Sequence, residues 1–213
     1  MSIGLVKYNN NSISAVTSAP NVGSGDMVLI KTLTADSAST VSFIHGSSDV
    51  IFDSTYPIYV LKIINAHLDL DDRSFNLNFT TDGTNFNVTK TTTFFRTTLG
   101  EDGSNQSFGY RTNADLAQST GDQVLGEAQS GGSGNADANI CVNLKIFNPS
   151  STVFVKNFLA TTQGVANGSL SENCFISGYC NTTSAITGFQ FDTGGGGATT
   201  IDGTFKLYGI KDS

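Results

Sequence analysis

The side chains best suited to chemistry are few in this chain, and their spacing matches no catalytic pattern. His45 and His67 are the two histidines, and the sequence contains no HExxH or CxxC motif. A zinc site built on these histidines would need further Cys or carboxylate ligands at suitable spacing. We therefore interpret His45, which lies just before Gly46, as a histidine satisfied within a turn.

The densest group of carboxylates follows His67 and comprises Asp69, Asp71 and Asp72. Carboxylate oxygens are the ligands that Ca²⁺ prefers. The segment nevertheless lacks the glycine and the distal glutamate of an EF-hand loop. These three residues are weak metal candidates, and the sequence predicts a solvated loop with no metal.

Glycine-rich segments offer little for catalysis. Residues 131–135 (GGSGN) lack the preceding apolar strand that a nucleophile elbow requires. Residues 194–197 (GGGG) open no predicted helix, so a phosphate cradle is not expected. Two carboxylates would suffice for glycoside cleavage, but the acidic residues fall mainly in predicted loops. We predict a protein with no catalytic residues and no cofactor, which is not an enzyme.

Composition narrows the function classes further. The net charge is −7, and the basic residues are scattered, whereas nucleic-acid binders present a basic face. No window approaches the roughly 20 apolar residues of a membrane span. The start of the chain lacks the features of a signal peptide. We expect neither nucleic-acid nor membrane binding, and synthesis in a reducing cytoplasm. In that setting Cys141, Cys174 and Cys180 are expected to be small buried hydrophobes.

The chain divides into a polar arm and one domain. Residues 1–25 are rich in Gly, Ser and Asn and form a predicted arm or linker. The apolar side chains within it are candidate assembly contacts: Ile3, Leu5, Val6 and Tyr8. Residues 26–213 form the predicted single domain. A frayed terminus is the alternative interpretation of the arm.

Short alternating runs follow one another from residue 26 onward. They are separated by turn signals, and no segment of helical length has a convincing apolar stripe. About ten short strands with this spacing predict an all-β fold, an antiparallel β-sandwich or jelly roll. The abundance of Phe predicts a core of phenylalanine. A single helical turn is expected at residues 113–119.

The pattern of residues 74–88 predicts a strand with one buried face, followed by a hairpin turn. Phe75, Leu77 and Phe79 are expected to point inward, while the intervening Asn76, Asn78 and Thr80 point to solvent. Asp82-Gly83 is a hairpin signal, after which the alternation resumes at Phe86 and Val88.

Tyr56 and Tyr59 flank Pro57 at the predicted entrance to a strand. Tyrosine combines an apolar ring with a polar tip, which suits it to interfaces. Both are therefore candidate assembly contacts at a rim of the sandwich.

Six segments between residues 42 and 210 carry a resemblance to a known family: SFIHGSSDVIFDSTYPIY (42–59), NVTKTTTFFR (87–96), DLAQST (115–120), PSSTVFVK (149–156), GYCNTTSAI (178–186) and GTFKLYGI (203–210). Together they resemble virion structural proteins of marine tailed bacteriophages. The resemblance implies a location in the phage particle, the virion, more than it implies a role. Residues 1–25 and the Asp69–Arg73 loop are not part of it.

Outer faces rich in Thr, Asn and Ser can pack together without desolvating many charges. We therefore expect a homo-oligomer, with a trimer as the specific expectation, that contacts the major capsid protein or other virion proteins. The first hypothesis is a capsid decoration or cement protein that stabilises the head by subunit contacts. The alternative is a tail-fibre or receptor-binding module that recognises host-surface glycans.

Overall fold

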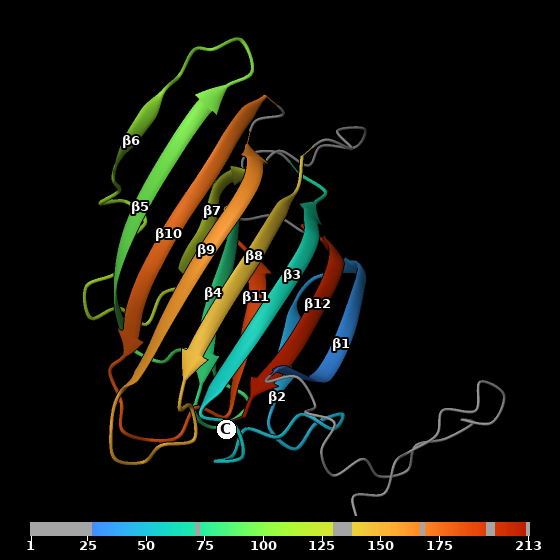
Figure 1. Ribbon diagram of the computed structural model, residues 1–213, viewed down its shortest axis with the longest axis vertical. Coiled ribbons are helices and arrows are strands. Elements are labelled where there is room, and N and C mark those ends of the chain that lie inside the picture. Colours follow the sequence, from blue (N-terminus) through green and yellow to red (C-terminus); the bar gives the residue numbers. More distant parts are fainter. Residues whose placement is uncertain (1–26, 71–72, 130–137, 167–168, 195–198, 212–213) are drawn as a thin grey trace, which may run out of the picture.

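The chain folds entirely into strands and their connections in the part that the structure describes. A computed structural model describes residues 27–70, 73–129, 138–166, 169–194 and 199–211. Figure 1 shows its twelve strands. They are β1 (Met27–Ala38), β2 (Val41–Ile44), β3 (Ile58–Leu68), β4 (Arg73–Thr80), β5 (Lys90–Gly100), β6 (Ser107–Tyr110), β7 (Gln123–Gln129), β8 (Ile140–Phe147), β9 (Lys156–Ala166), β10 (Leu170–Cys180), β11 (Gly188–Thr193) and β12 (Ile201–Ile210).

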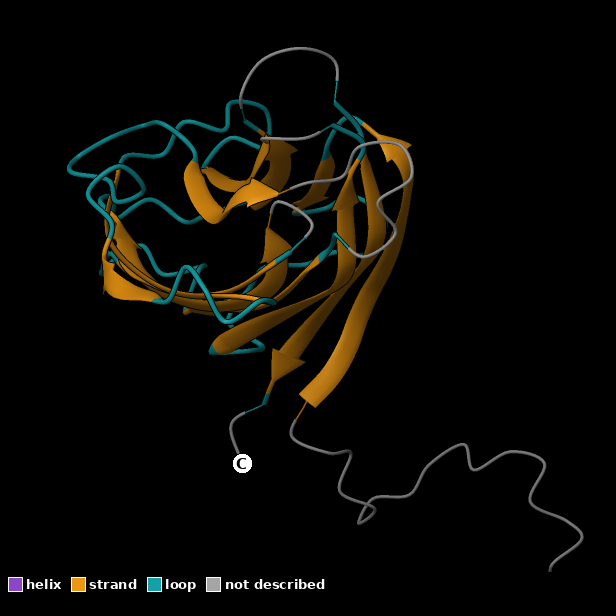
Figure 2. Ribbon diagram, turned by 90° about the horizontal axis from the view of Figure 1, so that it is seen from above, coloured by secondary structure: helices purple, strands orange, loops and turns teal. Residues whose placement is uncertain are grey.

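The strands form two antiparallel sheets packed face to face (Figure 2). The large sheet has the order β1-β12-β3-β8-β9-β10-β5-β6. The small sheet has the order β2-β11-β4-β7. Among the described residues, the backbone pair of Gln129 with Ala166 joins the end of β7, at the edge of the small sheet, to the end of β9 inside the large sheet. The predicted antiparallel sandwich is confirmed.

Eight of these strands have the connectivity of a jelly roll. The chain crosses from one sheet to the other at each step from β1 to β4, and strands from the two chain halves pair as β1 with β12 and β2 with β11. The four-stranded sets β1-β12-β3-β8 and β2-β11-β4-β7 match the two sheets of that fold. The remaining strands β9, β10, β5 and β6 extend the large sheet beyond β8, and we call them the extension.

Phenylalanine fills the space between the sheets, as expected from the composition. Phe75 stacks on Phe191 with ring centroids 5.7 Å apart. Phe79 of the small sheet meets Phe158 of the large sheet at 5.1 Å. All four rings are at most 1% exposed. Each such buried ring contributes about 2–3 kcal/mol through removal of apolar surface from water.

The expected faces of β4 are half right. Phe75, Leu77 and Phe79 point into the core, but Asn76, Asn78 and Thr80 are buried as well. Residues beyond β6 cover this second face, because the Asn78 Nδ2 donates to Thr120 O at 3.1 Å and to Asp122 Oδ1 at 2.7 Å.

The expected hairpin after β4 and the helical turn at 113–119 are both wrong. Asp82 closes a turn upon itself, since its Oδ1 accepts from Thr84 N at 2.8 Å and Asn85 N at 2.7 Å. One backbone bond crosses the turn, from Val88 N to Phe79 O at 3.2 Å, but the strand partners of β4 are β7 and β11. At 113–119 the backbone bonds to β5, as in the 2.8 Å contact from Thr92 N to Leu116 O. β7, which pairs with β4, was not anticipated.

Candidate functional site

The extension reverses the usual arrangement of a sheet, because its charged side chains point inward. Lys90 and Arg96 of β5, Lys156 of β9 and Glu172 of β10 all lie on the side that faces the interior of the sandwich. Lys90, Lys156 and Glu172 are at most 1% exposed. Charged residues are rarely buried so completely unless they are paired, so the inner face of the extension is an unusual environment.

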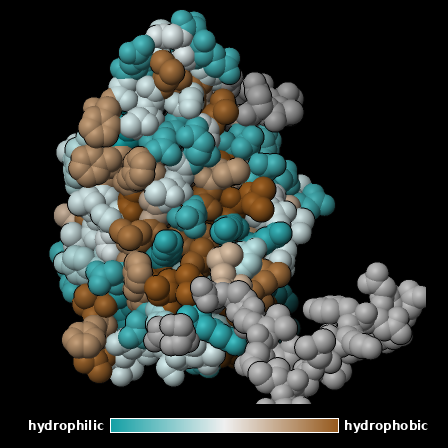
Figure 3. Space-filling model, in the orientation of Figure 1, coloured by the Kyte–Doolittle hydropathy of each residue, from teal (hydrophilic) through white to brown (hydrophobic). Residues whose placement is uncertain are grey.

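The outer face of the extension carries uncharged side chains only, and we call it the neutral face. Its residues alternate with the buried ones along each strand: Asn157, Leu159, Thr161, Gln163 and Val165 on β9; Ser171, Asn173, Phe175, Ser177 and Tyr179 on β10; Thr91, Thr93, Phe95, Thr97 and Leu99 on β5; Phe108 and Tyr110 on β6. Figure 3 views this side of the molecule, where tan side chains lie over β6 and β5 at the upper left and further brown side chains lie across the middle of the face.

Aromatic rings form the centre of the neutral face. Phe95 lies beside Phe108 with nearly parallel rings 6.4 Å apart, and beside Tyr110 edge to face at 5.2 Å. Phe175 is the cross-strand neighbour of Phe95. Phe108 is 76% exposed and Phe175 50%. Contiguous exposed apolar surface of this kind marks interaction sites on soluble proteins.

The jelly-roll half of the same sheet has an ordinary outer face. Lys62, Lys145 and Lys206 alternate with buried core residues on β3, β8 and β12. Lys62 and Lys206 are direct cross-strand neighbours. The two halves of one sheet therefore present a lysine-bearing surface and an uncharged aromatic surface side by side.

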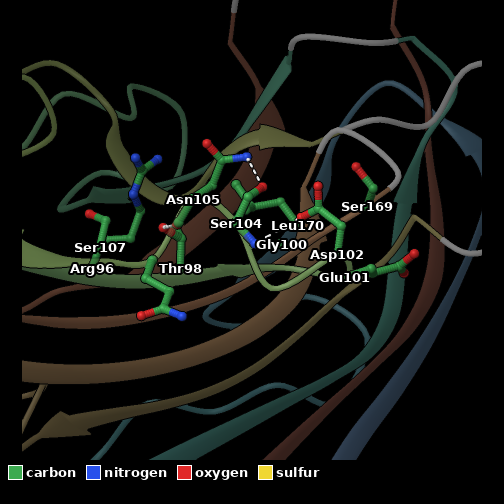
Figure 4. A pocket seen from close by; sticks show the side chains of 11 residues that line it. Arg96, Thr98, Gly100, Glu101, Asp102, Ser104, Asn105, Ser107, Ser169 and Leu170 are labelled. Atoms are coloured by element: carbon green, nitrogen blue, oxygen red, sulfur yellow. Dashed lines mark hydrogen bonds between the residues drawn. The ribbon is translucent and has the colours of Figure 1, made fainter.

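A polar pocket of about 710 Å³ lies at the end of the extension, on its inner side (Figure 4). Strands β5, β6 and β10 and the β5–β6 connection supply its walls. The lining residues are Arg96, Thr98, Gly100, Glu101, Asp102, Ser104, Asn105, Gln106, Ser107, Ser169 and Leu170. Hydroxyl, amide and carboxylate groups dominate this set, which suits a polar, hydrogen-bonding ligand.

Hydrogen bonds hold the loop of the pocket in shape. Thr98 Oγ1 donates to Asn105 O at 2.9 Å, and Ser104 N donates to Asp102 Oδ1 at 2.8 Å. Hydrogen bonds from Ser104 keep the pKa of Asp102 below its usual value. Asp102 is therefore ionised near neutral pH and is poorly suited to act as a general acid.

An ion pair lies next to the pocket on the inner face. Arg96 Nη1 is 3.3 Å from Glu172 Oε2, and the Glu172 side chain is 1% exposed. Removing one partner from such a pair leaves a buried charge uncompensated. Arg96 therefore has a structural role in addition to its place in the pocket wall.

Two buried lysines flank Cys180 at the opposite end of the extension. Cys180 pairs across the sheet with Lys90 on one side and Lys156 on the other. Lys90 Nζ donates to Asn78 Oδ1 at 2.6 Å and Val88 O at 2.8 Å, and Lys156 Nζ donates to Thr182 O and Ser184 O. Burial lowers the pKa of Lys90 to about 8 and raises that of Cys180 to about 12. Because its thiol stays protonated at neutral pH, Cys180 is a poor nucleophile.

The two tyrosines predicted as assembly contacts have different environments. Tyr59 is 1% exposed, and its hydroxyl accepts from Asp53 N and donates to Ile51 O, both at 3.1 Å. It has no surface to offer a neighbouring subunit, so the predicted assembly role does not fit Tyr59. Tyr56 is half-buried, with its ring 5.8 Å from that of Tyr59, and its assembly role stays a prediction.

The other predicted sites are only partly described. Asp69 Oδ1 accepts from Thr200 N at 2.7 Å and so ties two segments together. Asp71 and Asp72 lie outside the described residues, as do Ile3, Leu5, Val6 and Tyr8 of the arm. Among the described residues, no group of three or more His, Cys, Asp or Glu side chains is placed to hold a metal.

The predictions for His45 and for two of the three cysteines are confirmed. His45 Nδ1 accepts from Phe52 N at 3.0 Å, which confirms a histidine satisfied within a turn. Cys174 and Cys180 are buried, as expected, whereas Cys141 is partly exposed. All three are free thiols.

The neutral face and the inward charges were both missed from the sequence. One signal was present, since Phe94 and Phe95 are adjacent in a strand and must point to opposite faces. One of the two therefore had to point away from the space between the sheets. No comparable signal marks Arg96 or Glu172.

Comparison with family models, curated proteins and solved structures found no match to this chain. The phage resemblance therefore stays a prediction from sequence segments. No helix long and apolar enough to cross a membrane occurs in the described part of the chain.

Proposed function

We propose that this protein is a non-enzymatic structural subunit of a bacteriophage particle, a capsid decoration or cement protein that stabilises the head through subunit contacts. Its partners are the major capsid protein or other virion proteins. The neutral face is the observation that carries the proposal. A lattice subunit needs surfaces that bind other proteins, and exposed aromatic groups free of charge provide one.

Two further features support a mechanical role. The two sheets bury a phenylalanine core, which gives a rigid body. Hydrogen bonds lower the pKa of Asp102 and burial raises that of Cys180 to about 12, so neither side chain suits acid–base or nucleophilic chemistry at neutral pH. The sequence resemblance to phage virion proteins supports the location.

The test is to locate the protein in purified particles of a phage that encodes this chain. Mass spectrometry of intact particles should find it, and a particle reconstruction should place its sandwich on the outside of the head. Absence from the particle, or density at the tail tip alone, would refute the decoration role.

The polar pocket favours one second candidate, a receptor-binding module that recognises host-surface glycans. Saccharides are bound by hydroxyl, amide and carboxylate groups such as those of Asp102, Asn105 and Gln106, which line the pocket. A glycan array with purified protein tests it. Binding that is lost in the Asn105→Ala variant would support this candidate, whereas an array without signal would dismiss it.

A further inference from the structure

We infer that two copies of this chain pair through their neutral faces, so that the extension of one copy covers that of the other. The inference rests on the proposed function, because it names the first partner of an assembly subunit. It starts from the exposure of Phe175, Phe108 and Leu99, which are 50%, 76% and 47% exposed on a single sheet face.

Charge distribution identifies a second copy as the partner. The chain has a net charge of −7, so two copies repel each other over most of their surfaces. The neutral face is the region of the large sheet where they can meet without bringing like charges together. A partner recognised by charge would require charged side chains on the strands of this face, and these carry none. The Asp115 carboxylate lies beside the face, where it accepts a hydrogen bond from the Tyr110 hydroxyl at 2.6 Å.

The size and polar content of the face also suit a pair. Strands β5, β9 and β10 are each 11 residues long. With the four residues of β6 included, strands about 4.8 Å apart and about 3.3 Å per residue give this face roughly 600 Å². Two copies would then bury roughly 1,200 Å² in total, at the lower end of the range for specific interfaces. Local hydrogen bonds already satisfy some of its polar groups, as between Thr93 Oγ1 and Ser177 Oγ at 2.6 Å, beside the Phe95–Phe175 pair.

The symmetry of the contact predicts two copies. A surface that packs on the same surface of another copy is isologous, and such a contact closes at two subunits by a two-fold axis. The trimer expected from the sequence would need a contact between two different surfaces. Pairing through the neutral face therefore favours a dimer as the building unit.

The experiment is analytical ultracentrifugation of the purified full-length chain from low to tens of micromolar concentration. The wild-type protein should sediment at twice the mass of the chain. Phe175→Glu places two like charges at the centre of the contact, and this variant should sediment at the mass of one chain. Ile64→Glu is the matched control, because Ile64 is 42% exposed on the lysine-bearing half, and it should remain paired.

Two further measurements keep the test decisive. Circular dichroism and urea unfolding must show that Phe175→Glu is folded; if it is not, Thr161→Glu on the same face replaces it. A chain starting at residue 26 should still pair, and loss of pairing there would assign the contact to the N-terminal segment. Four outcomes would each overturn the inference: loss of pairing in the chain that starts at residue 26, a wild-type mass of one chain, a wild-type mass of three chains, or a folded Phe175→Glu variant that is still a dimer. All are independent of whether the protein is found in phage particles.

Discussion

The jelly-roll half and the extension belong to one continuous sheet, yet they distribute charge in opposite ways. On β3, β8 and β12, apolar residues point inward and Lys62, Lys145 and Lys206 point to water. On β5, β9 and β10, charged residues such as Lys90 and Arg96 point inward, while aromatic and amide side chains point outward. Both halves have the same strand geometry, so the difference must come from the surroundings of their inner and outer faces.

The difference indicates that the halves have different tasks. The jelly-roll half follows the pattern of a sheet with one face in the core and one face in water. In the extension, exposed rings add little stability to the isolated chain, and inward charges have a desolvation cost that their partners must offset. Such an arrangement is understandable if the outer face is covered in an assembly.

Substitution of two neighbouring phenylalanines tests the comparison with the largest effect. Phe94 is fully buried, whereas Phe95 is 39% exposed on the neutral face. Phe94→Ala should lower the free energy of unfolding by about 3–5 kcal/mol, and Phe95→Ala by about 1 kcal/mol or less. Urea unfolding in dilute solution measures both. Equal losses would show that the two faces of β5 are not as different as described.

Removal of an inward charge should have the next largest effect. Arg96→Met removes the guanidinium that lies 3.3 Å from the buried Glu172 carboxylate, which should cost about 3 kcal/mol. The control is Lys62→Met on the outer face of the jelly-roll half, expected to change stability by less than about 0.5 kcal/mol. Thermal and urea unfolding give the values. An Arg96→Met variant as stable as Lys62→Met would mean that the ion pair is dispensable.

Substitution of one glycine in each half of the sheet should have a smaller effect on stability. A Cβ on Gly209 of β12 would lie 2.3 Å from the Tyr56 ring, whereas one on Gly109 of β6 would have no neighbour within 4 Å. Gly209→Ala should therefore destabilise by about 1–3 kcal/mol through overpacking. Gly109→Ala should be close to neutral. Unfolding midpoints that rank the two variants in the opposite order would contradict the close packing of the β12 side.

The smallest predicted effect is a pH dependence from Lys90. Burial lowers the pKa of Lys90 to about 8, below the ordinary 10.5. Above pH 8 the folded state loses this proton while the unfolded state retains it, so the unfolded state binds more protons and stability rises with pH. Burial raises the pKa of Cys180 from 9.0 to about 12, which opposes this rise above pH 9.

The clean window for Lys90 therefore lies between pH 8 and pH 9. Over this interval the wild type should gain on the order of 1 kcal/mol relative to Lys90→Met. Urea midpoints at the two pH values provide the measurement. If the difference between the two proteins stays constant or shrinks, Lys90 is not held in the environment described.

The fold class and most strands followed from side-chain alternation, because a strand with one buried face repeats every two residues. The sequence did not show which strands pair, since pairing depends on contacts between distant segments. The Asp82-Gly83 signal failed because the Asp82 carboxylate binds the backbone of its own turn. Alternation also gives two faces without saying which is inside, so the inward position of Arg96 and the outward position of Phe175 became visible only in the folded chain.

Oxidative footprinting by mass spectrometry tests most directly whether the neutral face is a contact surface. The purified protein is labelled by hydroxyl radicals at low and at high concentration. The account predicts that oxidation of Phe95, Phe108 and Phe175 falls as concentration rises, while Leu29 and Ile64 on the jelly-roll half stay equally reactive. Equal oxidation of the three phenylalanines at all concentrations would contradict it.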